Sequence, residues 1–575
     1  MAGIKKTAAK GFAYLKKRGL RKTVRKTVLH IDRKRLEHRY VRRMTPPEEE
    51  LAAQRGTAFQ RPVRFSVIVP LYNTPMTLLC EMIDSVRKQS YTEWELCLAD
   101  GSDGEHEEVG ALCREQAEKE KRIRYRKLEK NEGISGNSNA ALEMATGEYI
   151  ALFDHDDLLR PDALFEMAKA IEETDADFLY SDEMIFATPK TSHIQGIRIK
   201  QDFAPEDLLP NNYICHLTVF RRTLLEKTGG FRPAFDGSQD HDLVLRLTAA
   251  AGRIVHIPKV LYYWRSVPGS VAADVHMKEY AIDAGRRAVE TFLHARGQTE
   301  ARVESTEVFP TMYRVRYPVS GNPSVRILLD AAREKGDTDE RLRKLWEQTR
   351  WENCSWQALS GERGISRRQR FAEAAAEAKE EYLVFADGIP ESLTPEWVLE
   401  MLMLAQQDET GAVGAKVRLA GGTDLRHAGV ILGLGEEGAA GRPYFDREDD
   451  LVGFFGQLAV VRNVSAVTDC WMVKREKFEK AGGFDPEYGD ALFEVDFCLK
   501  LREMGYRNLW TPYACLSGGE AKDFSLDVGK EFPGYPADRD LFRKKWKRIL
   551  ERGDPFYNPN LSLRHEDWRI DPRRT

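Results

Sequence analysis

The chain has 575 residues, of which 42% are hydrophobic and 31% charged, and its net charge is −4. A single hydrophobic core rarely grows past about 250–300 residues, so this length predicts two domains plus terminal segments. The composition excludes collagen, a disulfide-rich scaffold and wholesale disorder. No apolar run approaches the roughly 20 residues that span a bilayer, and the basic N-terminus lacks the apolar stretch of a signal peptide. Eight cysteines without a Cys-x-x-Cys pair are typical of reduced thiols, so we expect a cytoplasmic protein.

The first 45 residues are strongly basic, with 16 Lys and Arg against two acids, a local charge of +14 that leaves −18 for the rest. Within this segment Leu20, Val24, Val28 and Ile31 recur at helical spacing. A basic amphipathic helix of this kind predicts peripheral contact with an anionic membrane, here the inner face of the cell membrane, and a solvated basic arm is the equally weighted alternative. Nucleic acid is a poorer partner because the rest of the chain is acidic.

From residue 61 onward, predicted strands alternate with predicted helices. This order predicts an α/β fold with a mainly parallel sheet covered on both faces. Ligands of such sheets bind beyond the carboxyl ends of the strands. The predicted strands are 65–71, 94–98, 149–153 and 178–180, and the predicted helices begin at Pro75, at Gly133 and at Pro161.

The sequence also repeats itself once. Asp240–Leu247 aligns with Glu494–Leu501, and Glu148–Asp154 matches Glu381–Asp387. The separation is far longer than the roughly 20–50 residues of a solenoid repeat, so we expect a duplicated domain. The predicted organisation is a basic helical segment (1–60), a first domain (61–300), a connector (301–322), a second domain (323–535) and a C-terminal tail (536–575).

Polar residues follow the predicted strands of the first copy. A further acidic segment, Gln239–Asp242, lies later in the chain. Three carboxylates lie within Asp154–Asp157, and they repel one another unless a cation is present. Oxygen ligands suit Mg²⁺ or Mn²⁺, which neutralise phosphate oxygens. After earlier strands, Tyr72 offers a ring to a base, and Asp100 can accept hydrogen bonds from a base or ribose. A nucleoside diphosphate fits these groups together.

These motifs resemble those of family 2 glycosyltransferases, which have the A-type nucleotide-diphospho-sugar-binding fold. The resemblance covers about residues 64–270. The second copy and the tail 554–562 are similar to two-domain bacterial members that build rhamnose-containing and other surface polysaccharides. The matching segments are Ser66–Asn73, Ala99–Ser102, Asn131–Ser135, Asp154–Asp157, Gln239–Asp242 and Leu261–Arg265.

The resemblance implies an inverting sugar transfer in which Asp240 is the catalytic base and Asp154 and Asp156 bind the metal. The implied donor is linked to dTDP or UDP, and the implied acceptor is a polysaccharide or a lipid-linked glycan. Tyr263 stands where relatives often have His, so a histidine–metal contact at that position is in doubt. The implied donor-binding residues are Pro70, Tyr72, Asn73, Asp100, Gly133, Asn139, Asp154 and Asp157.

The second copy has lost most of these groups. Asp387 is retained, but Ile389 and Pro390 align with Asp156 and Asp157, and Glu494 replaces the implied base. We therefore expect a degenerate, non-catalytic domain that holds the acceptor glycan or packs against the first copy.

Two other functions are alternatives to sugar transfer. A non-catalytic glycan-binding or scaffold component of a polysaccharide-assembly complex would not need the intact carboxylates of the first copy. A nucleotidyltransferase would need a Gly-rich, basic first loop, and Pro70–Pro75 offers neither feature.

Overall fold

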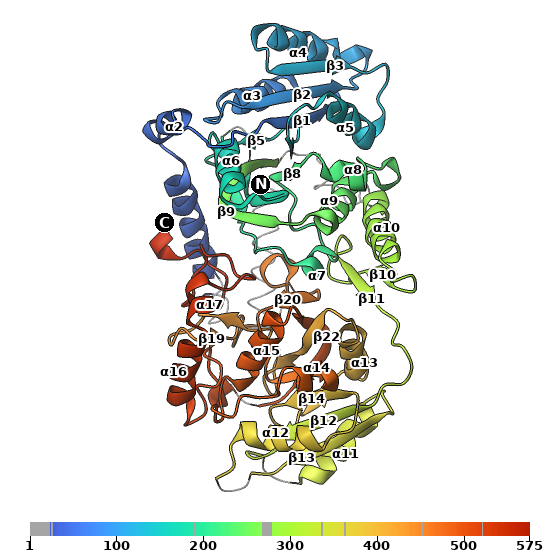
Figure 1. Ribbon diagram of the computed structural model, residues 1–575, viewed down its shortest axis with the longest axis vertical. Helices are drawn as coiled ribbons and strands as arrows, with labels where there is room; N and C mark the ends of the chain where they lie inside the picture. The colour runs from blue at the N-terminus through green and yellow to red at the C-terminus, as the bar shows by residue number, and fades with distance from the viewer. Residues whose placement is uncertain are drawn as a thin grey trace.

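The computed structural model describes Val24 and residues 27–574, except 188–189, 267–278, 335–336, 362–363, 450–451 and 520. Two α/β domains are stacked along the long axis, the first coloured blue to green and the second yellow to red (Figure 1). Within the described residues, no helix combines the length and the apolar character needed to cross a membrane.

The first domain is built on a nine-stranded sheet of order β3-β2-β1-β4-β8-β6-β9-β5, with β7 paired to β6. The neighbours β3, β2, β1 and β4 are parallel, as are β6 and β9, whereas β8, β5 and β7 run antiparallel to their partners. The mainly parallel sheet predicted from the sequence is therefore confirmed. The strands are β1 Phe65–Leu71, β2 Trp94–Asp100, β3 Ile123–Lys127, β4 Tyr149–Leu152, β5 Leu158–Leu159, β6 Phe178–Ala187, β7 Ile194–Arg198, β8 Thr218–Arg221 and β9 Ile254–Ser266.

Both faces of this sheet are covered. Successive side chains of a strand point to opposite faces, so each buried strand contributes to two cores. Val67 and Val69 lie in one core with Leu79, whereas Ile68 lies in the other core with Leu243. The helices of this domain are α3 Met76–Arg87, α4 Glu107–Lys119, α5 Gly133–Met144, α6 Ala163–Thr174, α7 Pro205–Leu208, α8 Leu224–Thr228, α9 Gln239–Ala250 and α10 Glu279–Ala295.

The second domain repeats this topology. Its sheet has the order β13-β12-β14-β21-β16-β22-β15, and every pairing has the same sense as in β2-β1-β4-β8-β6-β9-β5. The structure thus confirms the two tandem sheets expected from the repeat. The strands are β12 Val325–Asp330, β13 Cys354–Leu359, β14 Tyr382–Ala386, β15 Ser392–Leu393, β16 Thr410–Arg418, β17 Leu425–His427, β18 Ile431–Leu432, β19 Ala440–Gly441, β20 Arg462–Val464, β21 Cys470–Lys474 and β22 Arg507–Ser517.

The connector between the sheets contains a hairpin of β10 Arg302–Ser305 and β11 Tyr313–Arg316. The other helices are α2 Glu48–Arg55, α11 Thr338–Gln348, α12 Arg367–Glu377, α13 Trp397–Ala405, α14 Arg475–Lys480, α15 Phe493–Glu503, α16 Tyr535–Lys545 and α17 Lys547–Arg552.

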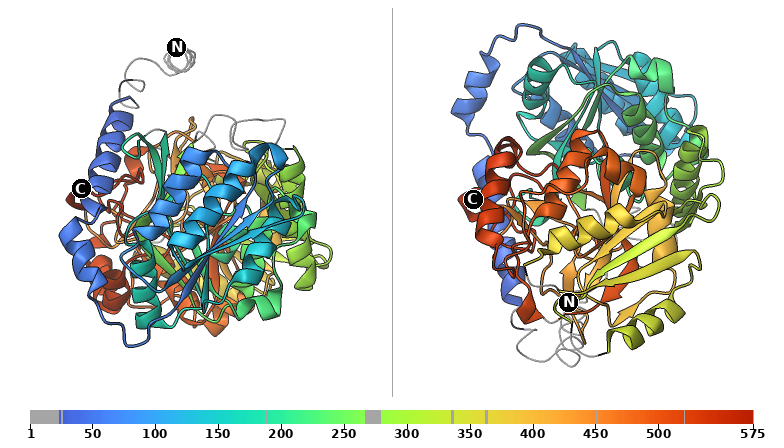
Figure 2. Two further views of the ribbon diagram at one scale, coloured as in Figure 1. Left: turned by 90° about the horizontal axis from the view of Figure 1, so that it is seen from above. Right: turned by 60° about the horizontal axis from the view of Figure 1, so that its bottom comes forward.

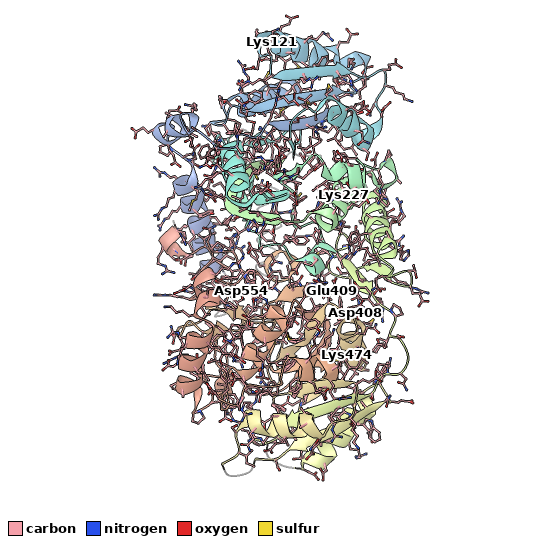
Figure 3. All side chains as sticks on the ribbon, in the orientation of Figure 1. Lys121, Lys227, Asp408, Glu409, Lys474 and Asp554 are labelled. Carbon is pink, nitrogen blue, oxygen red and sulfur yellow. The ribbon has the colours of Figure 1, made fainter. Side chains whose placement is uncertain are left out.

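The helix of residues 27–44 and the C-terminal segment join the domains from one side, where the blue helix lies beside the red segment (Figure 2). Tyr40 of this helix is fully buried in a core that also contains Phe186 of the first domain and Trp568 of the tail. In that tail, Asn558 Nδ2 donates to Asp182 Oδ2 at 3.1 Å. Asp554, labelled near the junction of the domains in Figure 3, accepts a hydrogen bond from the Leu432 N–H at 2.7 Å.

The domains also contact each other directly through α7 and β20. Asn463 Nδ2 donates to Glu206 Oε2 at 2.7 Å, and the Asn463 N–H donates to Asp207 Oδ1 at 2.6 Å. Arg507 forms an ion pair with Glu206 at 2.7 Å. A shared core and a polar contact of this kind fix the position of one domain against the other.

Candidate functional site

The acidic turn Asp154–Asp157 follows β4 at the carboxyl end of the first sheet. Asp157 is buried, and its carboxylate accepts from the Tyr262 O–H and from the Arg265 N–H, both at 2.6 Å. The Arg265 Nε donates to the backbone oxygen of Asp156 at 2.6 Å. The end of β9 thus holds the turn, and Asp157 serves as its internal support.

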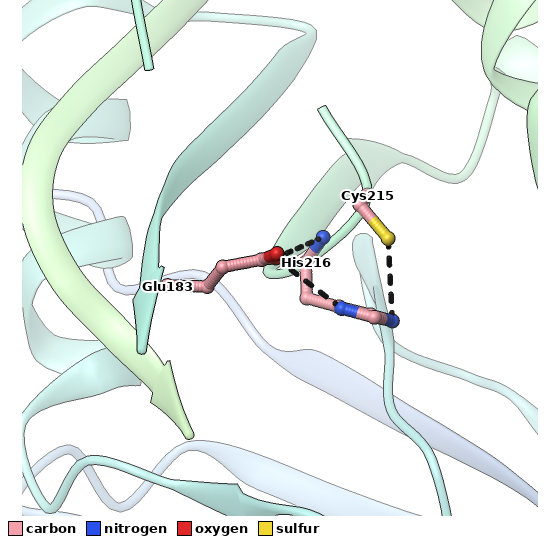
Figure 4. A group of neighbouring side chains, drawn as sticks. All are labelled: Glu183, Cys215 and His216. Atoms are coloured by element: carbon pink, nitrogen blue, oxygen red, sulfur yellow. Dashed lines mark hydrogen bonds and ion pairs between the residues drawn. The ribbon is translucent and has the colours of Figure 1, made fainter. Parts of the chain in front are cut away.

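A histidine that sequence reasoning did not single out completes this cluster. His216 Nε2 lies 3.2 Å from Asp154 Oδ2, and its Nδ1 lies 3.3 Å from Glu183 Oε2. Figure 4 shows the Glu183 carboxylate facing the imidazole of His216 beside Cys215. Asp154, Asp157 and His216 bring their ligand atoms within 4.8 Å of one another, and this group does not include Asp156.

The charges in this turn are poorly balanced. Burial, followed by the charges of Asp154 and Asp156, raises the pKa of Asp157 well above its usual range. Burial and the neighbouring Asp154 also raise the pKa of Asp156. The pKa of Asp154 is raised by burial, but His216 outweighs this effect and holds it below its ordinary value. Crowded carboxylate oxygens are the donor set of a hard divalent cation, and the residues of this turn fit such an ion.

Asp240 lies in the first turn of α9, and the N-cap residue of this helix is Ser238. The Asn212 Nδ2 donates to Asp240 Oδ2 at 2.9 Å. Its neighbours serve the fold, because Asp242 is buried in an ion pair with Arg246 at 2.6 Å and His241 is buried against a backbone oxygen. Asp240 is therefore the half-buried carboxylate of this motif that stays available for chemistry.

The start of α5 meets the loop that leads into α9. Gly133 has a left-handed φ of +75°, and a Cβ at this position would lie 2.8 Å from Asp236 Oδ2. The Ser135 hydroxyl donates to the other oxygen of Asp236. The left-handed backbone and the close approach of Asp236 both favour glycine at this position. The hydrogen bond between Ser135 and Asp236 places this predicted donor-binding segment next to the helix that carries Asp240.

Asp100, predicted to contact the nucleoside, is fully buried. Its carboxylate accepts from the Ser102 N–H and from the Tyr125 O–H, both at 2.8 Å, and pairs with Lys127 at 3.2 Å. Burial raises the pKa of Asp100, but these hydrogen bonds outweigh it and hold the pKa below its usual range.

Three other residues predicted to bind the sugar donor are also buried or hydrogen-bonded within the fold. The Asn73 N–H donates to Ser102 Oγ at 2.9 Å, which ties the end of β1 to the end of β2. The Asn139 side chain makes two hydrogen bonds of 2.9 Å with the Phe231 backbone. Pro70 is buried within β1. Tyr72, by contrast, is 47% exposed and free to stack on a ligand.

The second copy carries a pocket of about 820 Å³ at the corresponding strand ends. Strand pairing sets Leu152 opposite Thr218 in the first copy and Phe385 opposite Trp471 in the second, which places Asp469 where the first copy has His216. Arg426 pairs with Asp469 at 2.6 Å and also contacts Asp387. An arginine side chain therefore supplies the positive charge among these acids.

The residue aligned with Asp240 is also held by hydrogen bonds and an ion pair. Glu494 is buried, and its carboxylate accepts from Arg367 at 2.9 and 3.1 Å. Thr468 Oγ1 at 2.9 Å and Trp471 Nε1 at 3.2 Å complete its partners. Three side chains therefore hold this carboxylate inside the domain.

Comparison with known proteins agrees with this picture. The family model described as "Glycosyl transferase family 2" matches residues 66–229. The chain is 37% identical to the uncharacterised protein y4gI of Sinorhizobium fredii over 88% of this chain and 59% of that protein. It is 31% identical to the O-antigen biosynthesis protein RfbC of Myxococcus xanthus over 91% of this chain and 42% of that protein. It is also 32% identical to glycosyltransferase GlyG of Streptococcus pneumoniae serotype 4 over 40% of this chain and 77% of that protein.

The strand topology, the acidic turn and these similarities together define the class of protein. The chain belongs to glycosyltransferase family 2. It spans about half the length of the two curated relatives that it matches over most of its own sequence.

Proposed function

We propose that the first domain is an inverting glycosyltransferase that moves a sugar from a nucleoside-diphosphate donor to a growing surface polysaccharide or lipid-linked glycan. The observation that carries this proposal is the acidic turn Asp154–Asp157, which faces His216 at the strand ends of the same domain that presents Asp240. The similarity to a protein named for O-antigen biosynthesis supports the class of acceptor.

The exposed ring of Tyr72 is placed to stack on the base of a dTDP- or UDP-linked donor. Asp154 and Asp156 would hold Mg²⁺ or Mn²⁺, with His216 as a further donor atom near Asp154. When bound, such an ion neutralises the charge of the diphosphate leaving group.

Asp240 takes the proton from the acceptor hydroxyl as the acceptor oxygen bonds to the anomeric carbon and the bond from that carbon to the diphosphate breaks. Attack from the face opposite the leaving group inverts the anomeric centre, so no covalent enzyme intermediate is needed. The hydrogen bond from Asn212 to one carboxylate oxygen orients Asp240 and leaves the other oxygen for the proton.

The test is thermal unfolding of the full chain with UDP, dTDP and GDP, each with and without Mn²⁺. A ligand that binds the native state raises the melting temperature, so at least one nucleotide should do so in a Mn²⁺-dependent way. Asp156→Ala should remove this response while keeping the fold, and Asp408→Ala, an exposed acid remote from the turn, should keep it. A wild-type protein indifferent to all three nucleotides, or an Asp156→Ala variant with the full response, would contradict the proposal.

We further propose that the basic N-terminal helix lies on an anionic membrane at the cytoplasmic face. Val24, Val28 and Ile31 are 52%, 50% and 45% exposed and follow helical spacing, whereas Tyr40 of the same helix is buried. An apolar stripe among basic residues suits the boundary between anionic headgroups and acyl chains.

Co-sedimentation with phosphatidylglycerol vesicles tests this contact. Binding should weaken with added salt and in Val28→Asp, and it should be absent with phosphatidylcholine vesicles. Equal sedimentation with both lipids would remove the electrostatic basis of the proposal.

A further inference from the structure

A pocket of about 410 Å³ lies between the two domains, and residues of both line it. The first domain contributes Arg198, Asn211 and Tyr213. The second domain contributes Phe455 and Arg462. Its position is fixed by the contact between α7 and β20, because Arg462 begins β20.

The pocket adjoins the proposed chemistry on two sides. Asn211 precedes Asn212, whose amide holds Asp240. On the other side, Arg198 Nη1 lies 3.5 Å from Glu183 Oε1, and Glu183 in turn contacts His216. The pocket wall is therefore connected through Asn212 to the proposed base and through Glu183 to His216.

The second domain supports an exposed aromatic ring in this pocket. Phe455 is 44% exposed and has a left-handed φ of 49°, a backbone conformation that is uncommon for residues other than glycine. A Cβ on the next residue, Gly456, would lie 2.5 Å from Met312 Cε, so this loop packs tightly on the connector. Such strain is retained where the surroundings over-determine it, which is typical of ligand-binding segments.

The pocket also contains an accessible hydrogen-bond donor, because the Arg198 side chain in its wall is 32% exposed. The guanidinium of Arg198 lies 5.8 Å from the ring of Phe455. A sugar presents an apolar C–H face to a ring and hydroxyl oxygens to N–H donors, so it matches both features.

We propose that this pocket holds a sugar unit of the acceptor glycan, so that the second domain supplies acceptor-binding residues to the catalytic site of the first. The inference rests on the proposed function and extends it. The second copy would then build one wall of the acceptor site, with Phe455 as the stacking residue. Arg198 of the first domain, beside this ring, would donate to a hydroxyl.

Saturation-transfer NMR of the full chain with a panel of methyl glycosides of hexoses, deoxyhexoses and uronic acids tests the proposal. At least one glycoside should bind the wild type. Phe455→Asn, which tolerates the left-handed backbone but removes the ring, should bind that glycoside about tenfold more weakly. Phe455→Trp should restore binding, and Trp346→Ala, which removes an exposed ring on α11, should leave it unchanged.

The nucleotide response with Mn²⁺, measured on the same variants, separates this inference from the proposed function. The acceptor pocket predicts an unchanged nucleotide response in Phe455→Asn. Equal binding of glycosides to the wild type and Phe455→Asn, or no glycoside binding to the wild type, would overturn the acceptor pocket. Octanol serves as an apolar probe of the same pocket. Octanol binding to the wild type that no glycoside displaces, and that is lost in Phe455→Asn, would also overturn the acceptor pocket and identify a lipid-binding pocket.

Discussion

The two sheet domains share one strand order, yet they balance the charge at their strand ends in opposite ways. In the first copy the acids face His216, and burial and neighbouring acids raise the pKa of Asp157. In the second copy burial raises the pKa of Asp469, but Arg426 and Arg442 outweigh it and keep the pKa well below its usual range. The acids of the second copy thus have a cation built into the chain, Arg426, whereas the acids of the first copy face one another and His216.

This contrast has an energetic side. Buried carboxylates that lack a matching positive charge destabilise the fold, whereas a buried ion-pair network is costly only when one partner is removed. The first copy is therefore expected to be sensitive to substitution in activity, and the second copy in stability.

The largest effect should come from the proposed base. Asp240→Asn keeps size and polarity, so nucleotide binding should stay near that of the wild type, while the rate of sugar transfer falls by about 10²–10⁴ because the proton acceptor is lost. Turnover and nucleotide-dependent thermal shift, measured side by side, check this separation. A variant that loses nucleotide binding as well would place Asp240 in the donor site instead.

The built-in cation of the second copy can be removed. Arg426→Met should destabilise the protein by about 3–5 kcal/mol, because Asp387 and Asp469 are then buried without this partner. Urea unfolding measures the loss, with Arg343→Met on the exposed face of α11 as the matched control. An equally small change in both variants would mean that the acids of the second copy do not depend on this arginine.

A smaller change concerns the counterpart of the base. Glu494→Gln should leave turnover nearly unchanged and lower stability by about 1–3 kcal/mol, since the amide keeps hydrogen bonds to Thr468 and Trp471 but loses the charge that faces Arg367. Loss of turnover in this variant, without loss in Asp240→Asn, would assign catalysis to the second domain.

The smallest effect is a pH dependence of the second copy. Burial, together with Arg442, Arg426 and Arg462, lowers the pKa of His427 to about 4. Folding therefore favours the neutral imidazole, and its stabilisation is full above the unfolded pKa of about 6.5 and is lost as the pH falls toward 4.

Unfolding at pH 6.5 and pH 5 checks this dependence. Between these values the wild type should lose about 1–2 kcal/mol more stability than His427→Gln. Parallel losses in the two proteins would mean that His427 already shares a proton with Asp469 in the fold.

Much of the first domain follows from local sequence. The continuous apolar run of β1 and the polar residues just after β1, β2 and β4 predicted a mainly parallel sheet with a site at its carboxyl edge. The edge strand β3 and helix α4 were not predicted, because Ile123–Lys127 carries three basic residues and has too few apolar positions to stand out. Charged edge strands are common since they discourage pairing with another chain.

The sequence by itself determined the duplication, the family and the segments that meet at the site, because motif order and strand patterns are local properties of the chain. Tertiary structure decided which side chains of those segments remain available. Asp100, Asn139 and Asp157 are predicted donor-binding residues, yet their side chains form hydrogen bonds within the fold. His216 joins Asp154 only because β8 pairs antiparallel with β4, and Arg426 reaches Asp469 across 43 positions of sequence. Such contacts depend on the pairing of distant strands, which no local pattern encodes.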